Sequence, residues 1–149
     1  MKIAIGSDHA GLELKDYIKS ILLADKYDIK DFGTNSHESV DYPDYGFVLA
    51  KAVAAGEADR GILVCGTGIG MSVVANKVKG IRAALATDTY TAIQSRKHLD
   101  ANILVLGERV IGKGMAESIV KAWLAAEFEG GRHSGRITKI EEFEKTQDR

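Results

Sequence analysis

GILVCGTGIGMSVVANKV, residues 61–78, places an apolar run, a glycine-rich turn and a helix-like segment in direct succession. The run at 61–65 is almost wholly apolar, which predicts a central strand covered on both faces. The turn GTGIG at 66–70 leads directly into a predicted helix at 71–78. A buried strand followed by a short turn and a helix indicates one unit of a parallel α/β sheet.

The same alternation of strand and helix occurs five times along the chain. Strands are predicted at 2–7, 27–32, 61–65, 81–87 and 102–107, and helices at 10–26, 43–55, 71–78, 89–99 and 113–128. This order predicts a Rossmann-like three-layer sandwich, a five-stranded parallel sheet with helices on both faces. An extra C-terminal helix at about 137–144 belongs to no strand–helix unit, so we expect it to pack on the domain or on a neighbouring subunit. The whole chain, 1–149, is expected to form a single domain.

Composition excludes several classes of function before any motif is considered. The chain has 149 residues, 45% of them hydrophobic, and a net charge of −1, which argues against nucleic acid or an anionic membrane as the main partner. The single cysteine, Cys65, allows neither an intramolecular disulfide nor a multi-cysteine metal site, and a lone thiol fits a reducing compartment. No segment approaches transmembrane length, and the first apolar run is too short for a signal peptide. We therefore expect a cytoplasmic protein.

Polar and glycine residues gather where the predicted strands end. Asp8 and His9 follow the first strand, Cys65 ends the third, and Arg109 follows the fifth. In an open parallel sheet, ligands bind beyond the carboxyl ends of the strands. The order of predicted strands and helices also assigns His98 to this edge. We therefore expect the ligand-binding site here.

The turn at 66–70 is interpreted as an anion site. Its three glycines let the backbone approach a ligand closely, and the following helix start offers free N–H groups. Such a turn can hold a phosphate or a developing enediolate, or it can be a tight turn with no ligand. A dinucleotide fingerprint is disfavoured because the turn follows the third strand and Ala86 stands where an acidic residue is needed. The lysine of a phosphate-binding P-loop is also missing.

Cys65 and two histidines are the candidates for proton transfer. A thiol beside a helix N-terminus favours the thiolate, a nucleophile or a base, although a buried thiol at a strand end is commonly structural. His9 and His98 suit acid–base work. His37 and His133 lie in polar segments and are expected at the surface. No two histidines have the spacing of a helical metal site, so no metal is expected.

Arginines are the candidates for phosphate binding. Arg132 and Arg136 lie four residues apart in GGRHSGR, which is interpreted as a shaped loop, and Arg109 follows the fifth strand. The planar guanidinium can donate two hydrogen bonds to one phosphate. The alternative for each arginine is ordinary surface charge.

Several segments together resemble one family, in order and over nearly the whole chain. They are GSDHAG at 6–11, DYPDY at 41–45, GILVCGTGIGMSVVANKVKGIRA at 61–83, SRKH at 95–98, DAN at 100–102, GERVIG at 107–112 and WLAAEFEGGRHSGR at 123–136. In these segments the chain resembles the type B ribose-5-phosphate isomerases and the related galactose-6-phosphate isomerase subunits.

The resemblance implies an aldose–ketose isomerase that interconverts ribose 5-phosphate and ribulose 5-phosphate through an enediolate. It implies that Cys65 moves the proton between C2 and C1, that Thr67 helps to hold the enediolate, and that His98 assists opening of the sugar ring. The implied substrate-binding residues are Asp8, His9, Tyr42, Gly66, Gly68, Gly70, Arg109, Arg132 and Arg136. Within that set His9, Arg132 and Arg136 match the phosphate ligands. No metal or organic cofactor is implied, and a homodimer or homotetramer would share each site between two subunits.

Two positions refine what the resemblance implies. Met71 stands where one branch of the family has a glutamate base, so the chain resembles the cysteine branch. Leu99 stands where family members usually have an asparagine that helps to stabilise the enediolate. This departure leaves open another sugar phosphate, such as allose 6-phosphate, galactose 6-phosphate or a tetrose phosphate, or a phosphosugar-binding module without catalysis.

Overall fold

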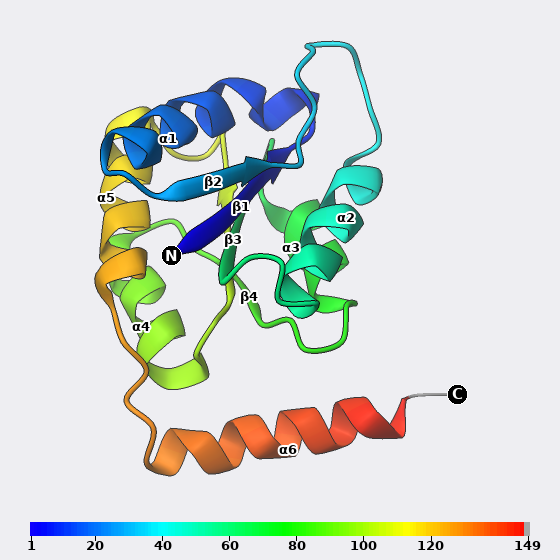
Figure 1. Cartoon of the computed structure of the whole chain (residues 1–149), viewed down its shortest axis with the longest axis vertical. Coiled ribbons are helices and arrows are strands. Elements are labelled where there is room, and N and C mark those ends of the chain that lie inside the picture. Colours follow the sequence, from blue (N-terminus) through cyan, green and yellow to red (C-terminus); the bar gives the residue numbers. More distant parts are fainter. Residues whose placement is uncertain (148–149) are drawn as a thin grey trace.

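A computed structural model describes residues 1–147 and contains a five-stranded, all-parallel sheet with strand order β2-β1-β3-β5-β4 (Figure 1). The strands are β1 (Lys2–Ser7), β2 (Asp28–Asp31), β3 (Arg60–Cys65), β4 (Ala83–Leu85) and β5 (Ile103–Gly107). The helices are α1 (Leu12–Ala24), α2 (Tyr42–Ala54), α3 (Ile69–Asn76), α4 (Thr89–Leu99), α5 (Lys113–Ala125) and α6 (Arg132–Thr146), and a 3-10 turn spans His9–Gly11. The predicted α/β class and the parallel sheet are confirmed.

Two apolar clusters fill the space on either side of the sheet. One cluster joins the strands to α1 and α5 through side chains such as Ile18 and Trp123. The other cluster joins the strands to α2 and α3 through Leu49 and Met71. Figure 1 shows α1, α4 and α5 on one side of the sheet and α2 and α3 on the other. The predicted three-layer sandwich is therefore confirmed.

The strand order determines where a site can form. The chain runs from β1 to β2 on one side and then crosses to β3 on the other side of β1. This reversal opens a crevice beyond the carboxyl ends of β1 and β3. β3 lies between β1 and β5 and is buried, as its apolar sequence predicts. β2 lies at an edge, and its polar sequence DIKD is alternately exposed and half-buried.

The C-terminal helix differs most from the sequence prediction. α6 has 15 residues and begins at Arg132, so the segment interpreted as a loop is helical. Gly130 and Gly131 have φ of 66° and 57° and redirect the chain just before the helix, a conformation that glycine tolerates. In α6 only His133 and Ile137 are buried, so this helix lacks the apolar stripe that identified the other helices.

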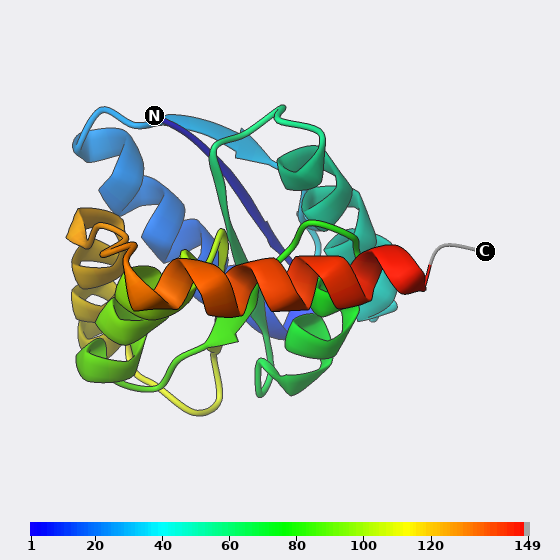
Figure 2. The same cartoon turned by 90° about the horizontal axis from the view of Figure 1, so that it is seen from below.

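α6 lies across one end of the molecule (Figures 1 and 2). It contacts α4, and its buried residues lie in its first two turns. Farther along, Ile140 and Phe143 are exposed, Phe143 to 66%, beside a hollow of about 640 Å³ that Leu99 also lines. The first half of α6 thus packs on its own chain, and the second half leaves apolar side chains uncovered. Within residues 1–147 no helix is both long and apolar enough to cross a membrane.

Candidate active site

A pocket of about 570 Å³ lies at the crevice between the carboxyl ends of β1 and β3. The predicted site residues that line it are Asp8, His9, Tyr42, Cys65, Gly66, Thr67, Gly70 and Arg109. Ala10, Ile69 and Val73 add apolar surface. The structure therefore brings together, in one chain, most of the residues that the sequence assigned to the sheet edge.

Cys65 is the last residue of β3 and is 5% exposed. Its Sγ accepts a hydrogen bond from the Gly68 N–H at 3.2 Å. Gly68 has φ of 83°, and a side chain there would also meet the Leu106 backbone at 3.2 Å, so the position requires glycine. The start of α3 places a partial positive charge beside the same sulfur. The loop is therefore suited to hold negative charge both on the sulfur and on a ligand.

Two backbone hydrogen bonds tie this loop to the end of β5. The Glu108 N–H donates to the Cys65 carbonyl, and the Arg109 N–H donates to the Gly66 carbonyl, each at 2.9 Å. The Glu108 carboxylate in turn accepts the Leu14 N–H at the start of α1. Arg109 is thereby placed over the loop, where a Cβ on Gly66 would lie 3.3 Å from its Nη1. The guanidinium is thus available beside the anion-binding backbone.

Asp8 and His9 are fixed by local hydrogen bonds at the end of β1. The Asp8 carboxylate accepts the Gly11 N–H at 3.1 Å and caps the 3-10 turn. His9 Nδ1 accepts the Val40 N–H at 3.1 Å. Because Nδ1 accepts, the proton of the neutral ring is on Nε2, which can donate to a ligand. Val40 lies two residues before α2, and its role in holding His9 was not identified from the sequence.

Tyr42 begins α2, and its ring lies against the glycine loop. A Cβ on Gly70 would lie 2.8 Å from this ring, so Gly70 is needed for the close approach of the phenol. Thr67 Oγ1 accepts the Ile69 N–H at 3.3 Å, within the turn that opens α3. Tyr42 and Thr67 thus line the same pocket as Cys65.

His98, Arg132 and Arg136 are not among the pocket-lining residues of the described chain. The expectation that His98 lies at the carboxyl edge is wrong. α4 begins there, with Asp88 as its N-cap, but its 11 residues span about 16 Å and carry the chain back to the opposite edge. The predicted length of this helix is enough to place His98 at the opposite ends of the strands. The order of strands and helices alone is not.

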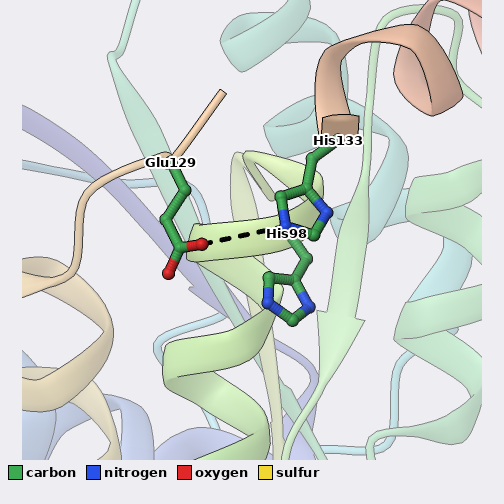
Figure 3. A group of neighbouring side chains, drawn as sticks. All are labelled: His98, Glu129 and His133. Atoms are coloured by element: carbon green, nitrogen blue, oxygen red, sulfur yellow. Dashed lines mark ion pairs between the residues drawn. The ribbon is translucent and has the colours of Figure 1, made fainter. Parts of the chain in front are cut away.

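His98 stacks on His133 beyond the amino ends of the strands, with ring centroids 4.1 Å apart and planes inclined by 13° (Figure 3). Glu129 Oε2 lies 3.7 Å from His133 Nε2. His133 is 4% exposed, so its expected surface position is wrong. Burial lowers the pKa of His133, and the nearby His98 and Arg132 lower it further.

His98, Glu129 and His133 carry side chains that can bind metal ions, a grouping that is not evident from the sequence. One ligand atom from each residue lies within 4.8 Å of the others. Nitrogen lone pairs lie in the ring planes, and two nearly parallel stacked rings cannot aim them at one metal ion. The geometry fits a metal only after one ring rotates. That the protein needs no metal stays a prediction.

Comparisons with known proteins identify the family. A model of the ribose/galactose isomerase family matches residues 3–140. Ribose-5-phosphate isomerase B of Escherichia coli is 50% identical over 93% of each chain. A solved structure of ribose-5-phosphate isomerase B from Clostridium thermocellum has a TM-score of 0.98 and 57% identity over 99% of this chain and all of that chain. Another, from Mycoplasma genitalium with bound ribulose-5-phosphate, has a TM-score of 0.93 and 44% identity over 97% of this chain and 96% of that chain. This chain belongs to the ribose/galactose isomerase family.

Proposed function

We propose that the chain is an aldose–ketose isomerase that interconverts ribose 5-phosphate and ribulose 5-phosphate through an enediolate. The position of Cys65 carries this proposal, because its sulfur lines the pocket beside a helix start and accepts the Gly68 N–H. The E. coli relative named ribose-5-phosphate isomerase B, and the bound ribulose-5-phosphate in the M. genitalium structure, support the choice of substrate.

Cys65 acts as the base in the proposed mechanism. Its thiolate takes the proton from C2 of the open-chain aldose, and the electron pair moves to form the enediolate. The free N–H groups of the 66–70 loop, with Thr67 beside them, stabilise the negative charge on oxygen. The thiol then returns the proton to C1, the hydroxyl proton on O2 passes to O1, and the ketose forms. Asp8 and Tyr42 border the pocket, where their side chains would contact the sugar hydroxyls.

Each site is completed by a second subunit. Cys65 and His9 lie at one edge of the sheet, whereas His98, Arg132 and Arg136 belong to the α4–α6 region at the other edge. A homodimer with a two-fold axis can place the latter group of one subunit over the pocket of its partner. His98 would then assist ring opening, and the two arginines would join His9 and Arg109 at the phosphate. The uncovered Ile140 and Phe143 of α6 support an association between subunits.

Leu99 supports a second candidate substrate within the same chemistry. It follows His98 and is 42% exposed, so its apolar side chain stands next to the proposed ring-opening group. An apolar group here favours a sugar that needs no amide contact at this position, such as allose 6-phosphate, galactose 6-phosphate or a tetrose phosphate.

The dependence on a reduced thiol suits the cytoplasm, where we propose that the enzyme works.

Turnover of ribose 5-phosphate by the purified wild type, with Cys65→Ala beside it, tests the proposal. Loss of the base should lower kcat roughly a hundredfold or more. Binding of inorganic phosphate should remain, because the mutation leaves the cationic groups in place. A Cys65→Ala variant that retains most of its turnover would exclude Cys65 as the base. An inactive but folded wild type would shift the assignment to the other sugar phosphates, which are assayed in parallel.

A further inference from the structure

We propose that Lys15 is a positioning residue for the phosphate end of the site. It holds the start of loop 33–41 in place, so that Val40 at the other end can orient His9 toward the pocket. The inference rests on the proposed function, in which His9 contacts the substrate phosphate. Lys15 lies on α1 and does not line the pocket.

The Lys15 side chain is fully buried, although it carries a charged group. Its Nζ donates to the Thr34 carbonyl at 2.8 Å and lies 3.0 Å from Asp31 Oδ2 and 3.5 Å from Asn35 Oδ1. A buried ammonium group is costly unless it is paired and hydrogen-bonded. Since Thr34 and Asn35 begin the loop, these bonds join the loop to α1.

Asp31 is the counter-charge of Lys15 at the end of β2. Burial acts to raise the pKa of this carboxyl, but hydrogen bonds from the Gly33 N–H, Lys15 and Lys19 outweigh burial and lower it. Gly33 itself packs closely on the end of β1, because a Cβ there would lie 2.6 Å from the Ser7 nitrogen. The ion pair therefore stands where the sheet ends and the loop starts.

The loop has a second attachment at its far end. Between Thr34 and Val40, residues 35–39 are exposed. The Val40 N–H then donates to His9 Nδ1 at 3.1 Å. This bond fixes both the plane of the imidazole ring and the nitrogen that carries its proton. Displacement of the loop would remove the bond, leaving His9 free to rotate and to exchange tautomers.

Lys15→Met and Lys19→Met form a matched pair that tests the role of Lys15. Lys19 is also on α1 and lies 3.1 Å from Asp31 Oδ2, but its side chain is 36% exposed. Each variant removes one cation from Asp31, and Lys15→Met also removes the bond to the Thr34 carbonyl. Lys15→Met should raise KM for ribose 5-phosphate about tenfold and change kcat less than about threefold. Lys19→Met should leave both constants within about twofold of wild type.

Nitrogen-15 NMR of the His9 ring gives a measurement that would not change if Lys15 only stabilised the fold. In Lys15→Met the His9 Nδ1 resonance should lose the shift of a fixed hydrogen-bond acceptor and move toward the average of two tautomers. An unchanged His9 spectrum with an unchanged KM in folded Lys15→Met would overturn the proposal. Equal changes in Lys19→Met would also overturn it, because the effect would then belong to Asp31 rather than to the loop.

Removal of a buried partner can prevent folding, so Lys15→Met is also combined with Asp31→Asn. Replacement of both charges leaves no orphaned buried ion, and the double variant should fold and show the same change at His9. A folded double variant with the wild-type His9 spectrum would count against the positioning role of Lys15.

His9→Ala separates the positioning role of Lys15 from the proposed phosphate role of His9. If His9→Ala leaves KM unchanged while Lys15→Met alters the His9 spectrum, the positioning by Lys15 stands and the phosphate role of His9 fails.

Discussion

The pocket around Cys65 lies beyond the carboxyl ends of the strands, and the stack of His98 on His133 lies beyond their amino ends. The two regions differ in the groups that form them. The pocket is centred on a glycine-rich backbone loop, which hydrogen bonds attach to the neighbouring strand end. The stack is formed by side chains from α4 and α6, joined by Glu129. The Glu129 N–H also donates to the Lys97 carbonyl, which fastens the chain before α6 to the end of α4.

This contrast shows which chemistry each region can perform. Backbone N–H groups and a thiol can move a proton and stabilise an enediolate, and they need close, fixed geometry. Imidazole and guanidinium groups can open a ring and hold a phosphate, and they can be supplied by another subunit. We therefore expect changes at Cys65 and its loop to lower kcat and changes at His98 to block ring opening. Changes at Arg132 and Arg136 should act chiefly on binding.

Gly68→Ala should have the largest effect, and Gly80→Ala is its matched control. Gly68 and Gly80 have φ of 83° and 84°, so both variants should lose about 1–3 kcal/mol of stability from backbone strain. A Cβ at position 80 meets nothing within 4 Å, whereas one at position 68 meets Leu85 and Leu106. Gly68→Ala should also displace the N–H that binds the Cys65 sulfur and lower kcat roughly a hundredfold.

Steady-state kinetics and urea unfolding of the two glycine variants separate strain from catalysis. Equal losses of activity in Gly68→Ala and Gly80→Ala would show that the turn matters only for folding. Gly68→Ala that retains full kcat would remove the loop amides from the mechanism.

Arg136→Ala should have an intermediate effect, confined to binding. A guanidinium–phosphate contact contributes about 1.5–3 kcal/mol, so KM for ribose 5-phosphate should rise roughly ten- to a hundredfold. The kcat should change little, because the arginine binds the phosphate, far from the carbons C1 and C2 between which the proton moves. An unchanged KM would place the phosphate elsewhere. Lys139→Ala, on the same helix one turn away, serves as the control for the loss of charge.

The His133 stack should make folding stability depend weakly on pH. Its pKa is lowered in the folded protein from the ordinary value of 6.5, so the folded state favours the neutral ring. As the pH falls through about 6.5, the unfolded chain takes up a proton first, and the free energy of unfolding decreases until the folded pKa is passed. Urea unfolding between pH 5 and 8 measures this slope. His133→Asn should flatten it, whereas His37→Asn in the exposed loop should not.

Most of the fold could be predicted from the sequence because the inner strands and most of the sheet-covering helices carry their own apolar patterns, whereas the edge strand β2 is polar. The pocket was also predictable, since Asp8, His9 and Cys65 follow strands whose ends must meet in a parallel sheet. The position of His98 was not, because it depends on the length of α4 rather than on the order of elements. α6 was misjudged because its apolar residues are few and several remain uncovered in one chain.

The shared site can be tested most directly with a heterodimer of Cys65→Ala and His98→Asn subunits, purified through two different tags. Each homodimeric variant should be nearly inactive. If each site takes Cys65 from one subunit and His98 from the other, one of the two sites in the heterodimer is intact, and about half of wild-type activity should return. A heterodimer no more active than its parents would contradict a site shared between subunits.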